Sequence, residues 1–257
     1  MLLSTSEIRT TEVLGWRGLH LLHFSMSSCS QKVRILLREK ELSWTSHPVN
    51  LTQGEQKTDW YRGINPNGVV PVLVHDGDVH IESNDILAYL DRTFPSEQGS
   101  YFPSDEAEKG AAKRLMELED ELHSDLRNIT FTFFVPGKLM KDAPVLSEDE
   151  VDASIRRFRD AFLELEQIIH ESGYLSGDRM MLPDIAWFIS MHRLVSGGYP
   201  IDQHPRLAAW YARLSKRPSM SAEIAQGPVL ARVAGQLFRW WKRTSRSSIR
   251  DRSPQGG

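Results

Sequence analysis

The stretch HFSMSSCSQKVRILL, residues 23–37, decides the fold of this chain. It overlaps the apolar run LHLLHF (residues 19–24), which has the composition of a short buried strand. Val33, Leu36 and Leu37 then fall on one face of a helix, with charged residues opposite. The stretch therefore predicts a strand that passes through a short polar turn into a helix.

The polar turn contains SSC, residues 27–29, with the only cysteine of the chain. The first backbone N–H groups of a helix have no helical partner, and the helix dipole places partial positive charge there. A thiolate, carboxylate or phosphate would therefore be stabilised at Ser27, Ser28 and Cys29. If the bound group is a thiol, a hydroxyl that donates to its sulfur favours the thiolate. The simpler alternative is that the serines only cap the helix.

Strand and helix patterns alternate through the first half of the chain. Three further short segments are rich in β-formers: residues 44–51, 70–74 and 78–82. Pro48 is typical of an edge strand, and Asp76-Gly77 is a strong hairpin signal. Ser83 is predicted as the N-cap of a helix that continues to Phe94. The order predicts an α/β domain with a parallel pair of strands and a terminal hairpin.

After Pro95 the apolar residues recur with helical spacing, as in residues 115–126 and 155–169. Residues 184–195 and 205–216 are predicted as two further amphipathic helices. No strand pattern interrupts them, so the second half is predicted to be an all-α helical bundle.

These patterns predict four parts of the chain. Residues 19–95 form the α/β domain, and residues 104–242 form the all-helical domain. Residues 1–18 are an N-terminal extension. Residues 243–257 are a basic tail, which we expect to be disordered.

The composition excludes several classes of function. The chain has 257 residues, 40% hydrophobic and 25% charged, which is typical of a soluble globular protein. A net charge of −3 argues against nucleic-acid binding. One cysteine cannot form an internal disulfide or a CxxC motif, so we expect a reducing, cytoplasmic location. The histidines show no metal-binding spacing, and we expect no metal.

Two further motifs suit an extended, amino-acid-like ligand. In NPNGVVPVLV, residues 65–74, a cis bond before Pro71 would turn the backbone of Val70 outward to pair with a ligand. The sequence leaves the isomer open. In IESND, residues 81–85, Ser83 at a helix start would hold a carboxylate, and Glu82 would pair with an ammonium group. The alternative is an ordinary capped helix.

Together these three motifs resemble the cytosolic glutathione transferase superfamily over roughly residues 19–223. The resemblance implies a thioredoxin-like N-terminal domain, a helical C-terminal domain, glutathione as cosubstrate, and a homodimer. It also implies a cis bond before Pro71 and backbone pairing of Val70 with the cysteinyl moiety of glutathione. Glu82 and Ser83 would bind the γ-glutamyl group. Gln56 and Lys57 would face the glycyl end.

The superfamily's catalytic serine or cysteine falls on Ser27, six residues before Val33. Ser28 is the second candidate and Cys29 the third. SSC resembles the serine-type zeta-class motif, in which the first serine activates the thiol of glutathione. Residues 55–83 resemble bacterial serine-type transferases, including those that cleave β-aryl ethers, so the subclass stays open.

The resemblance implies an enzyme that activates the glutathione thiolate for attack on a small hydrophobic electrophile, with a role in detoxification. A glutathione-dependent isomerase, a dehalogenase or a β-ether-cleaving lyase is an alternative. A further alternative is a non-catalytic binding protein with the same fold. An acceptor pocket is expected between the domains, near an aromatic cluster that we place at Phe131, Phe133, Phe134 and Met140.

Two features depart from the simple pattern. Met181 occupies the position of a helix-capping serine three residues before Asp184, and loss of that cap would cost about 1 kcal/mol. The tail combines Trp240-Trp241 with six basic residues. A helix that covers the pocket is the favoured interpretation of this tail, and contact with a membrane surface is the less favoured one.

Overall fold

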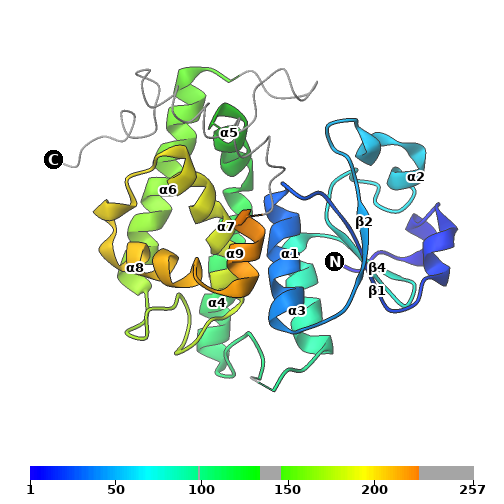
Figure 1. Ribbon diagram of the computed structural model, residues 1–257, viewed down its shortest axis with the longest axis horizontal. Coiled ribbons are helices and arrows are strands. Elements are labelled where there is room, and N and C mark those ends of the chain that lie inside the picture. Colours follow the sequence, from blue (N-terminus) through cyan, green and yellow to red (C-terminus); the bar gives the residue numbers. More distant parts are fainter. Residues whose placement is uncertain (98, 134–145, 226–257) are drawn as a thin grey trace. The chain divides into compact units, whose positions relative to one another are not determined.

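The computed structural model describes residues 1–97, 99–133 and 146–225. The chain divides into two compact units, Met1–Ser100 and Tyr101–Gly257. The first is α/β and the second is helical, which confirms the predicted fold class (Figure 1). Phe134, Met140 and the basic tail lie outside the described residues.

The first unit is built on a four-stranded sheet with the order β2-β1-β3-β4. Its strands are β1 (Leu19–His23), β2 (Thr45–Pro48), β3 (Val72–His75) and β4 (Asp78–His80). The β1–β2 pair is parallel, and the β1–β3 and β3–β4 pairs are antiparallel. Asp76 and Gly77 have φ values of 52° and 94°, the backbone that a two-residue hairpin turn requires. The predicted parallel pair and terminal hairpin are both confirmed.

The helices of the first unit are α1 (Ser28–Glu39), α2 (Asp59–Arg62) and α3 (Ser83–Thr93), with 3₁₀ turns η1 (Thr5–Glu7), η2 (Thr11–Gly15) and η3 (Glu55–Lys57). Helices α1 and α3 pack side by side (Figure 1). Near their first turns, Lys32 Nζ donates to Asn84 Oδ1 at 3.2 Å. Near their last turns, Lys40 Nζ and Asp91 Oδ1 form a buried ion pair at 2.9 Å. The two helices therefore run in the same direction, with their N-terminal ends together.

An apolar cluster packs α2 against the sheet. It includes Tyr61 and Ile64 from the α2 region and Val72 and Val74 from β3. Residues 1–18, which the sequence places outside the α/β domain, also contribute to this cluster. Their buried members are Leu3, Ile8 and Val13.

The second unit consists of α4 (Glu106–Glu121), α5 (His123–Phe133), α6 (Glu148–Ile168), α7 (Leu182–Gly197), η4 (Ile201–Gln203), α8 (Pro205–Leu214) and α9 (Pro218–Ala225). Helix α7 packs against α4, α5 and α8 and is buried on nearly all faces. The prediction that it is amphipathic is therefore wrong. A helix that is surrounded by other helices has no solvent face to keep polar.

The start of α7 shows how the missing serine cap is replaced. The Asp184 carboxylate is fully buried and accepts hydrogen bonds from Met181 N–H at 2.8 Å, Leu175 N–H at 3.0 Å and Trp210 Nε1–H at 2.7 Å. Burial raises the pKa of Asp184 to about 6, although the three hydrogen bonds oppose this shift. Through these bonds the side chain joins the start of α7 to Trp210 of α8.

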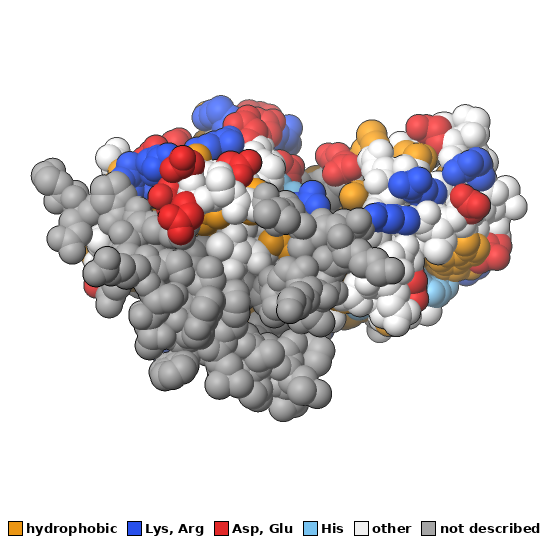
Figure 2. Space-filling view, turned by 90° about the horizontal axis from the view of Figure 1, so that it is seen from above, with side chains coloured by type: hydrophobic (Ala, Val, Ile, Leu, Met, Phe, Trp, Pro, Cys, Tyr) orange, Lys and Arg blue, Asp and Glu red, His pale blue; other side chains and the backbone are white. Residues whose placement is uncertain are grey.

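On the part of the face in Figure 2 that is not grey, acidic and basic side chains lie next to one another. This mixed surface agrees with a net charge of −3 in a chain that has 31 basic and 34 acidic residues. Among the described residues, no helix combines the length and the apolar content that a membrane span requires.

Candidate active site

Strand register brings the three predicted ligand-binding segments to one end of the sheet. Leu22 of β1 lies opposite Val72 of β3, and Leu73 of β3 lies opposite His80 of β4. The residues after β1, before β3 and after β4 therefore meet. These are the SSC turn, the Val70-Pro71 segment and the Glu82-Ser83 segment.

Ser27 is the N-cap of α1. Its backbone is extended, with φ −71° and ψ 123°, and its Oγ accepts a hydrogen bond from Ser30 N–H at 3.2 Å. Accepting one bond leaves the hydroxyl hydrogen able to donate to a ligand. Ser28 is the first residue of the helix, and Cys29 the second; all three side chains are partly buried. Capping and ligand binding are therefore compatible at Ser27.

Arg34 holds the turn that leads to Ser27. Its guanidinium is buried and donates from Nη1 to Phe24 O at 3.2 Å and from Nη2 to Ser25 O at 2.9 Å. Nη1 also lies 2.9 Å from His23 Nδ1, and His23 Nε2 lies 2.7 Å from Ser46 Oγ. One planar cation thus fixes two carbonyl groups and one imidazole. The sequence reasoning missed Arg34, although its position inside the apolar run VRILL was a signal of burial.

We expect Arg34→Lys to lower the free energy of unfolding by about 1–2 kcal/mol, because an ammonium group cannot reproduce the fork of bonds to Phe24 O and Ser25 O. Urea denaturation measures the change. Arg156→Lys on an exposed face of α6 is the matched control and should change stability by less than about 0.5 kcal/mol. Equal effects of the two substitutions would contradict the anchoring role.

The neighbouring His23 predicts a pH dependence of stability. Burial, and next the Arg34 guanidinium, lower the pKa of His23 to about 4 from its ordinary value near 6.5. Between these two values the unfolded chain binds a proton that the folded chain does not. This contribution to stability is therefore complete above pH 6.5 and is lost as the pH falls toward 4.

The loss should be on the order of 2 kcal/mol, after a discount for partial solvent access. Urea denaturation at pH 7 and pH 4.5 would show a smaller acid loss in His23→Asn than in the wild type. His170→Asn, on an exposed turn, should keep the wild-type loss. A His23→Asn protein with the full wild-type acid loss would contradict this assignment.

The Val70-Pro71 peptide bond is cis, as the family resemblance implies. Both residues are buried, and β3 begins at the next residue. The carbonyl group of Val69 accepts hydrogen bonds from Tyr61 OH at 2.8 Å and from Asn65 Nδ2 at 2.8 Å. Two side chains from the α2 region therefore set the position of the segment that contains Val70.

Glu82, and not Ser83, occupies the N-cap position of α3, and Ser83 is the first helical residue. The prediction of Ser83 as the N-cap is therefore wrong. Glu82 has φ 65° and ψ 116°, a sparsely populated backbone conformation that costs a non-glycine residue on the order of 1–3 kcal/mol. Its exposed carboxylate accepts a hydrogen bond from Asn67 Nδ2 at 3.3 Å. Ser83 is buried, and its N–H lies in the first turn of α3.

Gln56 and Lys57 lie in the 3₁₀ turn η3. Gly68 brings this turn close to the Val70 segment, because a Cβ at Gly68 would lie 3.0 Å from the carbonyl oxygen of Gln56. The Oε1 atom of Gln56 is buried and has no hydrogen-bond partner among the described residues. Lys57 is exposed. These contacts connect η3, the Val70 segment and Glu82 around one end of the sheet.

The site can hold an anion and an extended peptide-like ligand. The N-terminal ends of α1 and α3 lie together, so the positive ends of two helix dipoles point to one place. The cis segment supplies backbone groups beside them. A thiolate near Ser27 and a carboxylate near Ser83 would both meet positive potential.

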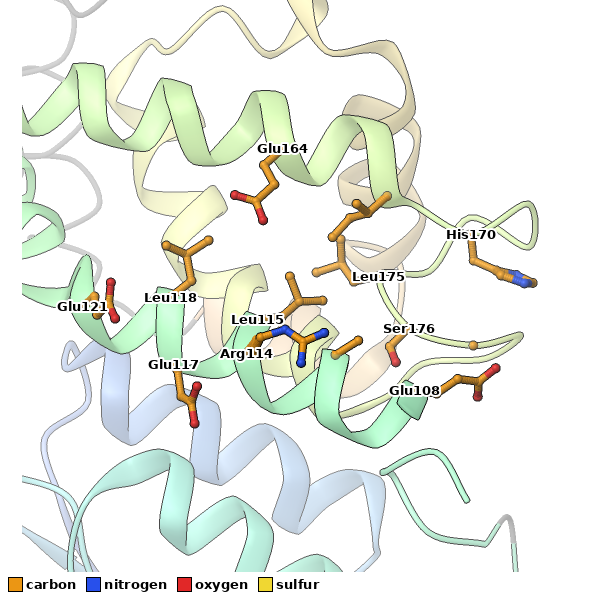
Figure 3. Close-up of a pocket in the computed structure, with 13 residues that line it drawn as sticks. Glu108, Arg114, Leu115, Glu117, Leu118, Glu121, Glu164, His170, Leu175 and Ser176 are labelled. Carbon is orange, nitrogen blue, oxygen red and sulfur yellow. The ribbon is translucent and has the colours of Figure 1, made fainter. Parts of the chain in front are cut away.

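A groove of about 590 Å³ in the second unit differs in charge from the site at the end of the sheet. Figure 3 shows it between α4 and α6, with Leu115, Leu118 and Leu175 at its walls. Its four glutamates are Glu108, Glu117, Glu121 and Glu164. Arg114 also lines the groove, but the four glutamates outnumber it, and this excess of negative charge disfavours a ligand that carries carboxylates. The groove is therefore not the counterpart of the anion site at the sheet.

Comparison with known proteins agrees with the geometry. The model of the glutathione S-transferase N-terminal domain matches residues 26–93, and that of the C-terminal domain matches residues 148–213. A zeta-class glutathione S-transferase of Euphorbia esula is 30% identical over 203 residues, 78% of this chain and 87% of that protein. Protein LigF of Sphingobium is 27% identical over 234 residues, 79% of this chain and 91% of that protein.

Solved structures lead to the same family. The crystal structure of the β-etherase LigF from Sphingobium has a TM-score of 0.71 and 25% identity, and the match covers 81% of this chain and 99% of that chain. Glutathione transferase F7 from Populus trichocarpa has a TM-score of 0.70 and 25% identity, with 80% and 98% covered. The chain belongs to the glutathione S-transferase family, whose cosubstrate is glutathione.

Proposed function

We propose that Ser27 donates a hydrogen bond to the sulfur of glutathione and thereby activates the thiolate for attack on a small hydrophobic electrophile. The observation that carries this proposal is the position of the Ser27 hydroxyl at the N-cap of α1, where its hydrogen can face a ligand. Ser28 and Cys29 begin the helix behind it and are the second and third candidates for this contact.

The energetics of this arrangement are sufficient. Lowering the thiol pKa by two units requires roughly 2.7 kcal/mol. A hydrogen bond to a charged group contributes about 1.5–3 kcal/mol, and a helix N-terminus adds up to about 1 kcal/mol. Together they populate the thiolate near neutral pH.

The other parts of glutathione would bind to residues at the same end of the sheet. Val70, the residue before Pro71, would pair its backbone with the cysteinyl moiety. Ser83 N–H and the α3 dipole would hold the γ-glutamyl carboxylate, and Glu82 its ammonium group. Gln56 and Lys57 in η3 would face the glycyl carboxylate.

In the reaction the thiol proton leaves to solvent and the sulfur lone pair forms a bond to the electrophilic carbon. In a substitution, the bond to the leaving group breaks and that group departs with its electron pair. The protein contributes mainly by positioning the two reactants and by populating the thiolate.

Cleavage of β-aryl ethers is one candidate reaction, because LigF, titled a β-etherase, matches both the sequence and the fold. Glutathione-dependent isomerisation is the second, because of the similarity to a zeta-class relative and the SSC motif. Dehalogenation and non-catalytic binding are the remaining alternatives.

Product analysis separates these reactions. The purified full chain is incubated with glutathione and a β-aryl ether, an organic halide or a cis-enone acid. Ether cleavage yields one phenol per glutathione consumed, and dehalogenation yields one halide ion. Isomerisation consumes no glutathione. A protein that binds glutathione and turns over none of these, nor a simple aryl electrophile, would contradict the proposed transferase activity.

We also propose a homodimer and a cytoplasmic location. The homodimer is supported by membership of the family, and the location by the single cysteine. Sedimentation equilibrium should give twice the 29.4 kDa mass of one chain. A mass of one chain at micromolar concentration would contradict the dimer.

A further inference from the structure

Residues 1–16, here called the N-terminal segment, extend the sheet at β4. Leu3 N–H donates to Val79 O at 2.9 Å, and Ile81 N–H donates to Met1 O at 2.9 Å. Leu2 forms an antiparallel bridge with His80. The segment therefore pairs with the edge strand immediately before Glu82.

The same segment then holds the C-terminal end of α2. Arg9 N–H and Thr10 N–H donate to Gly63 O at 2.7 and 3.1 Å. Thr10 Oγ1 donates to Trp60 O at 2.7 Å, and Trp60 Nε1 donates to Glu12 Oε1 at 2.9 Å. A helix of four residues has few internal bonds, and the last carbonyls of any helix need partners from elsewhere. The N-terminal segment supplies those partners.

Close packing supports this contact. A Cβ at Gly63 would overlap Thr10 Oγ1, so the segment approaches α2 at a point where only glycine fits. Leu3, Ile8 and Val13 are buried in the cluster that contains Tyr61. The segment is thus part of the packing of α2.

The α2 region, residues 59–65, in turn positions the Val70-Pro71 segment, where the backbone of glutathione is proposed to bind. Tyr61 OH and Asn65 Nδ2 both donate to Val69 O at 2.8 Å, one residue before Val70. A continuous set of contacts therefore runs from Thr10 through α2 to Val69. We infer that the N-terminal segment is a positioning element for glutathione, which sets α2 and thereby the backbone of Val70. This inference rests on the proposed function.

Two substitutions loosen this contact in different ways. Gly63→Ala pushes Thr10 away from α2, while its backbone, at φ −71°, accepts alanine. Thr10→Val removes only the hydroxyl bond to Trp60 O and keeps the side-chain volume. The control is Gly110→Ala in α4, where the nearest atom to an added Cβ is Arg114 Nη1 at 3.6 Å.

The first measurement is the Kd of glutathione by calorimetry on the full chain. Coupling through a packed element typically changes affinity by 0.5–2 kcal/mol, which is about 2- to 30-fold. We expect Gly63→Ala to weaken binding within this range, Thr10→Val to weaken it less, and Gly110→Ala to leave it unchanged. KM for glutathione should rise more than kcat falls.

The second measurement is amide hydrogen exchange of the unliganded protein. Exchange should rise in residues 59–70 of Gly63→Ala and Thr10→Val and stay at the wild-type level in α1. A lower melting temperature with an unchanged Kd in both variants would overturn the inference and leave the proposed function intact. If Gly63→Ala does not fold, Thr10→Val decides. A wild-type protein that binds no glutathione would overturn the proposed function, and this result would precede any variant.

Discussion

We expect Ser27→Ala to lower kcat/KM for glutathione conjugation by about 10- to 150-fold, the rate equivalent of a 1.5–3 kcal/mol hydrogen bond to a charged group. Alanine cannot donate to the sulfur, so the bound thiol would ionise closer to its pKa in water. The dipoles of α1 and α3 remain, and activity should therefore fall without vanishing. Steady-state kinetics with an aryl electrophile at pH 6.5 measure the effect, and a higher pH should partly restore the rate.

Two further variants separate chemistry from capping. Ser27 also caps α1, so its loss costs about 1 kcal/mol of stability. Ser147, which caps α6 and accepts from Glu150 N–H at 3.3 Å, is a matched serine outside the proposed site. Ser147→Ala should lose similar stability and keep its kcat/KM. If Cys29→Ala instead causes the larger loss of activity, the thiol contact belongs to Cys29 and the chemistry moves toward thiol transfer.

The second large effect is expected at Asp184. Asp184→Ala leaves three buried donors unpaired: Met181 N–H, Leu175 N–H and Trp210 Nε1–H. Each buried unpaired polar group costs about 1–3 kcal/mol, so the loss of partners for three groups should lower the free energy of unfolding by at least about 3 kcal/mol. Urea denaturation measures the change.

A graded series tests the same site. Asp184→Asn keeps one carbonyl oxygen, which can accept the bonds from Leu175 N–H and Trp210 Nε1–H. The amide NH2 group replaces the second oxygen, so the bond from Met181 N–H is lost. Trp210→Phe removes one donor and leaves the carboxylate with two. Both should cost less than Asp184→Ala. A cost below about 1 kcal/mol for Asp184→Ala would show that the carboxylate does not carry the start of α7.

Local signals were sufficient for much of the fold. The polar turn between β1 and α1, the Asp76-Gly77 hairpin and the change from strand to helix spacing near Pro95 each depend on neighbouring residues. The cis bond before Pro71 came from the resemblance, because the residues alone leave the isomer open. Site roles for Ser27, Val70, Glu82 and Gln56 stay predictions.

The errors have tertiary causes. Ser83 is a residue type that is common at N-caps, but Glu82 occupies that position, with a positive φ that no local rule predicts. Helix α7 has polar residues at intervals, which suggested a solvent-exposed face, but other helices surround it. Asp184 is buried and accepts hydrogen bonds within the second unit.

Long-range contacts were the hardest to predict. The apolar run VRILL signals that Arg34 is buried, but its contacts with Phe24 O and Ser25 O depend on how the turn folds back. Residues 1–16 show no long apolar period, and their contacts with α2 connect positions about fifty residues apart. Such contacts follow from the packing of whole elements and leave little mark on local sequence.

The most direct test of the account is the titration of the glutathione thiolate bound to the full chain, followed by its ultraviolet absorbance. We expect the bound thiol of the wild type to ionise well below its pKa in water, and Ser27→Ala to remove most of that shift. An equal shift in the wild type and in Ser27→Ala would contradict the role of Ser27. A bound thiol that ionises at its solution pKa in the wild type would contradict thiolate activation at this site.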